Sequence, residues 1–471
     1  MDRPRLASLV EGYVEQAAVP ELTRYGTIPC LSPSFDPDWR AHGHLDRAAE
    51  LVRAFAAHRP LREVRADVLA APGRTPIVLV DVPATDPARD GETTLVYGHL
   101  DKQPPLGTWR TGLDPFRPVR HGDRLYGRGL ADDGYAAFAA LGALESLESL
   151  GEGHGRVVVL IEASEESGSP DLEPSLDLVA DRLGRPALVV CLDSGGPTYD
   201  RLWLTSSLRG NLVVTLTVEV LTEGVHSGHA GGIVPDSFRL ARHLLDRVED
   251  PATGRVRLPE LHVQVPPHRR QEIAAVAAEL GPVAAGAFPT VPGLRLASPD
   301  PADRIELATW HPSLTVIGAD GLPAVADGGN VLRPATSLKC SLRLPPTCDA
   351  AAALAAPEEA LTADPPDGAT VRLHADAPAQ GWDAPALSPA LSARVEAASI
   401  AHFGAPARVL GLGGSIPFLA ALGTRYPSAQ LLATGVLGPG SNAHGPNEVL
   451  ELGALKSLTA CLAELLTATP S

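Results

Sequence analysis

Three short apolar runs in the N-terminal half constrain the fold most strongly. They are Thr94–Tyr97, Val157–Ile161 and Ala187–Leu192. Each run is continuous and has the length of a strand, as strands buried on both faces of a parallel sheet require. The intervening segment Ala136–Leu150 has the pattern of a helix, which gives strand–helix–strand units. We therefore expect an α/β sheet with helices on both faces.

The pattern changes near residue 209 and returns near residue 384. Leu212–Val220 and Ser337–Leu344 alternate apolar and polar residues, which predicts strands with one buried face. The other elements expected in this segment are helices at 237–248 and about 350–362 and strands at 314–317 and 370–373. Beyond it we expect helices at 392–402 and 455–466 and a strand at 430–433. Residues 1–208 and 384–471 are thus predicted to form one α/β domain, interrupted by an α+β domain at 209–383.

Charge and cysteine content exclude several classes of partner. The formal net charge of −17 argues against nucleic-acid and membrane-surface partners, which select basic patches. The five cysteines are scattered and form no CxxC pair, so we do not expect a disulfide framework. We expect instead that the protein lies in the reducing cytoplasm. No signal peptide or membrane-spanning run is predicted.

Residues that commonly bind metals follow several predicted strands, where ligands bind in α/β folds. They are His99 and Asp101, Asp132 and Asp133, Glu162, Glu165 and Glu166, Asp193, and His444. Each alone has an ordinary alternative, such as a polar turn, a helix-capping aspartate, an exposed acidic loop or a structural histidine. Together they supply two imidazoles and enough carboxylates for two metals that share a bridging aspartate and leave room for water.

Five segments in order resemble the motifs of the M20 metallopeptidase family: YGHLDKQP, GRGLADDG, EASEESGS, the strand ending at Asp193, and NAHGPNE. The resemblance covers nearly the whole chain and is closest to the dipeptidase branch that includes carnosinases and cytosolic nonspecific dipeptidases. It implies a di-metal α/β catalytic domain and, at 209–383, a ferredoxin-like lid and dimerisation domain.

The same resemblance implies a role for each matched residue. One metal is held by His99 and Asp193, the other by Glu166 and His444. Asp132 bridges them, and the Asp132–Asp133 peptide bond is expected to be cis. The catalytic residues implied are Asp101, which orients His99, and Glu165, the general base.

The resemblance also covers residues that contact substrate. His226 is expected to reach the active site of the partner subunit in a homodimer and to hydrogen-bond the oxyanion. Asn330 and Arg343 are expected to bind the substrate carboxylate, since arginine offers two parallel donors. Gly414 and Ser415, in a Gly-Gly-Ser-Ile-Pro loop, are expected to contact the same end of the substrate.

The implied reaction is hydrolysis of the amide bond of a dipeptide or short peptide with a free C-terminal carboxylate, as in a dipeptidase or carboxypeptidase. A metal-bridging hydroxide attacks after Glu165 removes the proton. His and carboxylate ligands favour zinc, and manganese or cobalt also suit them. Three alternatives stay open: an N-acyl-amino-acid deacylase or deblocking amidohydrolase, an amide-forming acyltransferase, and a metal-binding scaffold without turnover, against which the presence of Glu165 argues.

Three positions depart from the pattern of relatives. Gly134 follows the aspartate pair where relatives usually have lysine, and Gly411-Leu412 replaces Arg-Glu before the Gly-Gly-Ser-Ile-Pro loop. Gln380 lies just before Trp382, in a stretch where the dipeptidase branch often has histidine. The last two lie near the expected substrate end, so they bear on the choice of substrate more than on hydrolysis.

Overall fold

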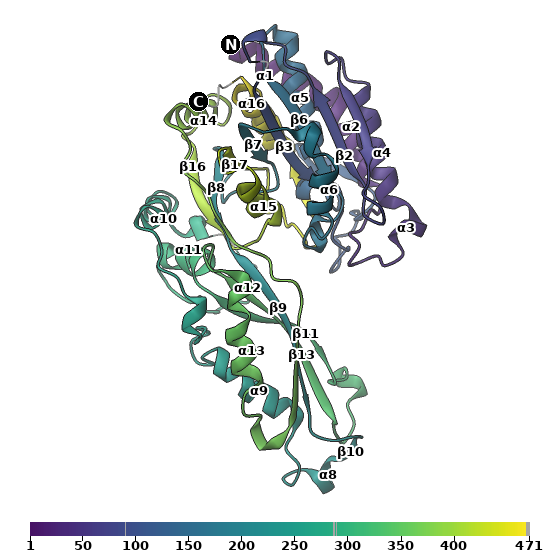
Figure 1. Ribbon diagram of the computed structural model, residues 1–471, viewed down its shortest axis with the longest axis vertical. Helices are drawn as coiled ribbons and strands as arrows, with labels where there is room; N and C mark the ends of the chain where they lie inside the picture. The colour runs from purple at the N-terminus through teal and green to yellow at the C-terminus, as the bar shows by residue number, and fades with distance from the viewer. Residues whose placement is uncertain (90, 286–287, 289, 468–471) are drawn as a thin grey trace.

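The chain folds into an α/β part that carries both termini and a long arm that extends from it (Figure 1). The computed structural model describes residues 1–89, 91–285, 288 and 290–467. The mixed α/β fold confirms the expected fold class. Among these residues, no helix combines the length and apolar character needed to cross a bilayer.

The α/β part is built on a six-stranded sheet of order β1-β2-β6-β3-β7-β17. Its strands are β1 (Arg65–Leu69), β2 (Ile77–Val82), β3 (Thr93–His99), β6 (Arg156–Glu162), β7 (Leu188–Cys191) and β17 (Gln430–Ala433). Strands β6, β3, β7 and β17 run parallel, β2 pairs antiparallel with β6, and β1 pairs antiparallel with β2. The three apolar runs are therefore central parallel strands, as predicted.

Helices cover both faces of this sheet, which confirms that expectation. Residues of β2 alternate between two cores: Val78 and Val80 pack in one, Ile77 and Leu79 in the other. The first core includes residues of α1 (Arg3–Tyr13), α4 (His44–Ala57), α5 (Ala136–Leu150), α14 (Pro389–His402) and α16 (Leu452–Leu466). The second includes residues of α6 (Leu172–Leu178) and α15 (Pro417–Arg425).

A second, three-stranded sheet lies between the α/β part and the arm. Its order is β15-β8-β16, with β8 at Trp203–Leu208, β15 at Trp382–Asp383 and β16 at Arg408–Leu412. Helices α10 (Pro267–Leu280) and α11 (Pro301–Trp310) pack against β16 around Trp203, Trp310 and Leu410. None of these strands and neither helix was predicted from the sequence, because their apolar pattern is weak and the sheet joins distant segments.

The arm contains a four-stranded antiparallel sheet of order β11-β13-β9-β14. The strands are β9 (Gly210–Glu219), β11 (Ser313–Asp320), β13 (Ala335–Leu344) and β14 (Thr370–Ala375). Helices α9 (Ser237–Val248), α12 (Ala350–Ala353) and α13 (Ala355–Thr362) pack on it. The expected helix at about 350–362 is thus two helices with a break at Leu354.

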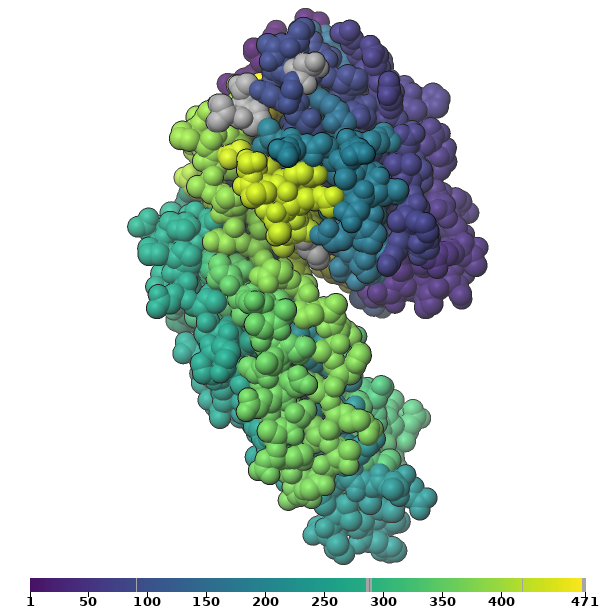
Figure 2. All heavy atoms as spheres, viewed as in Figure 1, coloured from purple at the N-terminus to yellow at the C-terminus, as the bar shows by residue number. Residues whose placement is uncertain are grey.

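At the far end of the arm, β10 (Val225–His226) pairs with β12 (Val331–Leu332) next to α8 (Ser227–Ala230) (Figure 1). Along one side of the arm, β11 is an edge strand with exposed Val316 and Ile317. A hollow opens between this arm and the α/β part on one side of the molecule (Figure 2).

Candidate active site

The ends of three parallel strands bring most of the predicted ligands together. Strand β3 ends at His99, β6 leads into Glu165 and Glu166, and β7 is followed two residues later by Asp193. Because β3 pairs with both β6 and β7 in parallel, these residues lie at one edge of the sheet.

Two loops deliver the remaining ligands to this edge. Asp132 lies in the turn Leu130–Gly134 before α5, and the Asp132–Asp133 peptide bond is cis, as the resemblance led us to expect. The backbone of His444 is left-handed, with φ of 61°. Asn442 and Asn447 in the same loop are also left-handed, with φ of 52° and 62°. Such a conformation is uncommon for residues other than glycine and is kept where the surroundings require it.

Asp132 faces both imidazoles, one with each carboxylate oxygen. His99 Nε2 lies 3.4 Å from Asp132 Oδ1 and 3.8 Å from Asp193 Oδ1. His444 Nε2 lies 3.0 Å from Asp132 Oδ2 and 3.1 Å from Glu166 Oε2. Candidate ligand atoms of His99, Asp132 and Glu166 fall within 4.8 Å of one another, as do those of His99, Glu165 and Asp193. The two groups share His99, and Glu165, expected to be the base, falls in the second of them. The position of Asp132 between the two imidazoles is what a metal-bridging aspartate requires.

The electrostatics of the cluster fit bound cations. Burial and neighbouring carboxylates raise the pKa values of Glu166 and Asp193 above their usual range. Burial would also raise the pKa of Asp132, but the interactions with the His444 and His99 imidazoles outweigh it and lower that pKa. His99 Nε2 is buried without a hydrogen-bond partner among the described residues. Buried polar atoms are rarely left without a partner, so this nitrogen suits a metal ligand. The cluster can therefore hold divalent metal.

Asp101 connects the two strand ends that carry the site. Its carboxylate accepts hydrogen bonds from the backbone amides of Glu165 at 3.2 Å and Glu166 at 3.0 Å. His99 Nδ1 lies 3.1 Å from the Asp101 carbonyl oxygen and 3.6 Å from its carboxylate. The backbone carbonyl of Asp101 thus contacts the His99 ring, and its buried carboxylate holds the glutamate pair.

A buried ion pair that the sequence did not single out connects the two ligand loops. Arg128 Nη1 donates to Glu448 Oε2 at 2.7 Å, and Nη2 donates to the Gly445 carbonyl at 2.6 Å, next to His444. Glu448 also accepts from the backbone amides of residues 129, 131 and 132. Both residues belong to segments that resemble family motifs, but only the structure shows that they support Asp132 and His444 together.

The predicted substrate residues fall into two groups. Arg343 and Ser415 are in contact, with Arg343 Nη1 at 3.4 Å from Ser415 Oγ, and exposed Gly414 precedes Ser415. Asn330 and His226 lie instead at the far end of the arm, where Ser227 N donates to the Asn330 carbonyl at 3.0 Å. Strand β13, ten residues long, separates Asn330 from Arg343. The prediction that Asn330 and Arg343 bind one carboxylate requires them to lie close together, and within one chain they do not.

Each departure from the family pattern has a local packing reason. A Cβ on Gly134 would lie 2.2 Å from a ring carbon of Tyr25, so the tyrosine fills the space of a side chain. A Cβ on Gly411 would lie 2.4 Å from Ser207 Oγ. Gln380 accepts from the Ala350 amide at 3.0 Å and donates to a backbone carbonyl in the same loop at 2.8 Å, which stabilises the start of α12.

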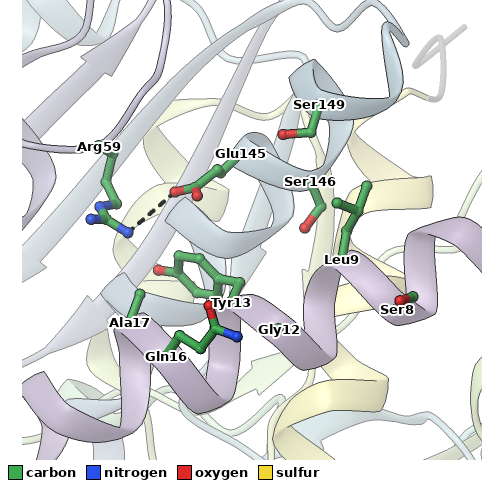
Figure 3. A pocket seen from close by; sticks show the side chains of 10 residues that line it. All are labelled: Ser8, Leu9, Gly12, Tyr13, Gln16, Ala17, Arg59, Glu145, Ser146 and Ser149. Carbon is green, nitrogen blue, oxygen red and sulfur yellow. Dashed lines mark hydrogen bonds and ion pairs between the residues drawn. The ribbon is translucent and has the colours of Figure 1, made fainter.

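Two surface cavities lie away from this cluster. One of about 370 Å³ lies between α1 and α5 beside the Arg59–Glu145 ion pair (Figure 3). Another of about 340 Å³ lies between β8, β16 and α14. Neither is lined by a predicted site residue.

Known proteins resemble this chain over most of its length. The family model for peptidase family M20/M25/M40 matches residues 95–468. A cysteinylglycine-S-conjugate dipeptidase from Corynebacterium striatum is 28% identical over 81% of this chain and 82% of its own length. A Cys-Gly metallodipeptidase from Saccharomyces cerevisiae is 25% identical over 82% of each chain.

Solved structures show the same fold. A dipeptidase from Saccharomyces cerevisiae superposes with a TM-score of 0.80 at 20% identity, covering 99% of each chain. Human carnosine dipeptidase 1 gives a TM-score of 0.78 at 18% identity, covering 99% of this chain and 98% of its own.

Proposed function

This chain belongs to peptidase family M20/M25/M40 and is a metal-dependent hydrolase, and we propose that it cleaves dipeptides or short peptides with a free C-terminal carboxylate. The observation that carries the proposal is Asp132, whose two carboxylate oxygens face His99 and His444 separately. Relatives named as dipeptidases over some four-fifths of the chain support the dipeptide substrate.

We assign His99, Asp132 and Asp193 to one metal position and Asp132, Glu166 and His444 to the other, with zinc as the preferred ion and manganese or cobalt as substitutes. Divalent ions held there supply Lewis acidity, which polarises the scissile carbonyl and lowers the pKa of a nearby water. Residues 1–208 and 384–471 then act as the catalytic domain, and residues 209–383 as the lid.

Glu165 is the proposed general base. Burial and the nearby Asp193 carboxylate raise the pKa of Glu165 well above its usual range, so its carboxylate has a strong tendency to take a proton. It removes the proton of the attacking water and passes it to the leaving amine. Asp101 holds the Glu165 amide at 3.2 Å and keeps this carboxylate in place.

We further propose that the enzyme is a homodimer in which the arm reaches across. His226 and Asn330 lie together at the end of the arm, remote from the strand ends of their own chain (Figure 1). His226 of the partner subunit would then donate to the oxyanion, and Asn330 of the partner subunit would meet the carboxylate held by Arg343 and Ser415. The five cysteines are free, which supports a cytoplasmic location.

N-acyl amino acids are a second candidate substrate. Leu412, where relatives usually have glutamate, packs against an apolar core directly before the loop expected to bind the substrate carboxylate, so this end of the site differs from that of the dipeptidase relatives. An N-acyl amino acid offers the same carboxylate and the same kind of amide bond.

A substrate panel separates the two candidates. Metal-free protein is supplied with zinc, manganese or cobalt in turn and assayed on dipeptides, N-acetyl amino acids and N-succinyl amino acids. We expect hydrolysis of dipeptides with at least one metal. Turnover confined to the acyl amino acids would replace the dipeptidase proposal with the deacylase, and no turnover with any metal would contradict both.

A further inference from the structure

Two arginines border the loop that includes Ser415. Arg343 on β13 donates to Ser415 Oγ, and Arg209, just before β9, donates through Nε to the Gly413 carbonyl at 3.2 Å. Arg343 pairs in register with Asn211, two residues after Arg209, so the arginines are diagonal neighbours on adjacent strands. Two guanidinium groups therefore lie at the same end of the arm sheet, against one loop.

No carboxylate of the described residues lies within ion-pair distance of either arginine. The remaining contacts of Arg209 are neutral, namely the His311 carbonyl at 3.3 Å and Ser313 Oγ at 3.1 Å. Four other arginines in the described part of the chain are buried, and each of them forms an ion pair with a carboxylate no more than 3.0 Å away. They are Arg89, Arg128, Arg201 and Arg269.

Both guanidinium groups are poorly compensated in the free protein. Burial and the charge of Arg343 lower the pKa of Arg209 to about 10. Burial also lowers the pKa of Arg343. A half-buried cation without a counter-charge gains when an anion binds, because the anion replaces lost hydration.

The loop between the arginines is adjacent to the metal cluster. Residues 413–416 lead directly into α15, whose Phe418 ring stacks on Tyr97 at 3.4 Å between ring centroids. Tyr97 precedes His99 by two residues on β3. A substrate that lies across this cluster can thus place the residue it releases against the loop.

We propose that Arg209 makes the enzyme selective for substrates that release aspartate or glutamate. The inference rests on the proposed function, in which Arg343 and Ser415 bind the α-carboxylate. Arg209 then binds the side-chain carboxylate, so that a residue with two negative charges meets two guanidinium groups. Leu412, the half-buried neighbour of this loop, contributes no competing negative charge.

The test compares Ala-Glu with Ala-Gln, which differ in charge and hardly in shape. We expect the wild-type kcat/KM for Ala-Glu to exceed that for Ala-Gln by about tenfold or more, the range of a charged hydrogen bond. Arg209→Met should bring this ratio close to one, and Arg209→Lys should keep part of it. As a matched control, Arg304→Met removes a half-buried arginine whose hydrogen bonds within the described residues go to the carbonyls of Ser298 and Pro299, and it should leave the ratio unchanged.

Two results would overturn the inference: a wild-type ratio near one, or an Arg209→Met variant that loses both substrates in equal proportion. If Arg209→Met does not fold, calorimetric binding of L-glutamate and L-glutamine to the wild-type protein and to Arg209→Lys decides, with a preference for glutamate expected in the wild type and reduced in the variant. Failure of both dipeptides as substrates would count against the proposed function, and the same binding comparison would still test the role of Arg209.

Discussion

Several carboxylates lie close together at the ends of β3, β6 and β7, where their negative charges repel unless cations compensate them. Glu165, Glu166, Asp132 and Asp193 lie in one cluster, and the imidazoles of His99 and His444 lie among them as candidate cations. Hydrogen bonds with Asp132 and Glu166 raise the pKa of His444 to about 11 although burial acts to lower it. In the metal-free protein, protonated imidazoles compensate the negative charge of the carboxylates, a role that bound divalent ions would take over.

Replacing Glu165 by glutamine should separate metal binding from turnover. The amide keeps the shape of the side chain but cannot accept a proton, so kcat should fall by about 10²–10⁴. Metal content, measured by elemental analysis, should not change, and Glu173→Gln on the surface of α6 serves as the control. Near-normal turnover in the Glu165 variant would remove Glu165 as the base.

Glu448 should matter for metal binding although it is not a ligand. In Glu448→Gln the charge opposite Arg128 disappears, and one of the two oxygens that accept from Arg128 and the amides of residues 129, 131 and 132 is replaced by an NH2 donor. Metal affinity, measured by competition with a chelating dye, should fall about 10- to 100-fold. Glu451→Gln, which breaks the more exposed pair with Arg124, should have little effect. Equal losses in both variants would contradict the supporting role of Glu448.

At the scale of elements, helices α1, α14 and α16 meet at one buried carboxylate. Glu464 of α16 accepts from Arg3 Nε at 2.8 Å and lies 2.7 Å from His402 Nε2. Burial acts to raise the pKa of Glu464, but hydrogen bonds with His402 and Arg3 outweigh it and lower that pKa to about 2. This contact ties the start of the chain to its last helix.

The sign of the pH dependence follows from this lowered pKa. Glu464 contributes its full stability above the unfolded pKa of 4.5 and loses it as pH falls from there through about 2. Glu464→Gln should therefore lower the free energy of unfolding at pH 7 by at most about 3 kcal/mol. The difference in the free energy of unfolding between the variant and the wild type should shrink as pH falls below 4.5. Urea unfolding at a series of pH values measures it, with Glu11→Gln as the control. A difference independent of pH would contradict the assignment.

The elements could be predicted where the apolar pattern was strong. The expected helices 136–150 and 237–248 and the strand 430–433 match α5, α9 and β17 to the residue. Strands β8 and β16 escaped prediction because they pair across some 200 residues and lack a clear period. The ligand residues could be found by motif, but the contact of Glu448 with three amides depends on tertiary structure alone.

On the scale of the whole molecule, the arm separates residues that were expected to act together. Arg343 and Ser415 meet near the α/β part, whereas His226 and Asn330 lie at the other end of β13. No sequence pattern could show this, because spacing along the chain does not give distance in the fold. In the homodimer that we propose, the end of the partner subunit's arm would bring these residues together with Arg343 and Ser415.

Mixed dimers test this arrangement. Subunits carrying His226→Ala and subunits carrying Glu165→Ala should each be nearly inactive alone. When they are unfolded together and refolded, mixed dimers should regain activity, because one site then combines an intact Glu165 with an intact His226 of the partner subunit. Refolded single variants are the control, and absence of any recovery would contradict action across the dimer.

Calorimetric titration of the metal-free protein with zinc tests directly whether Asp132 bridges two metal ions. We expect two ions bound per chain in the wild type, with dipeptide hydrolysis rising as the second site fills. We also expect weakened binding at both sites in Asp132→Asn. One ion per chain, or an Asp132→Asn variant that binds two ions as tightly as the wild type, would contradict this bridging role.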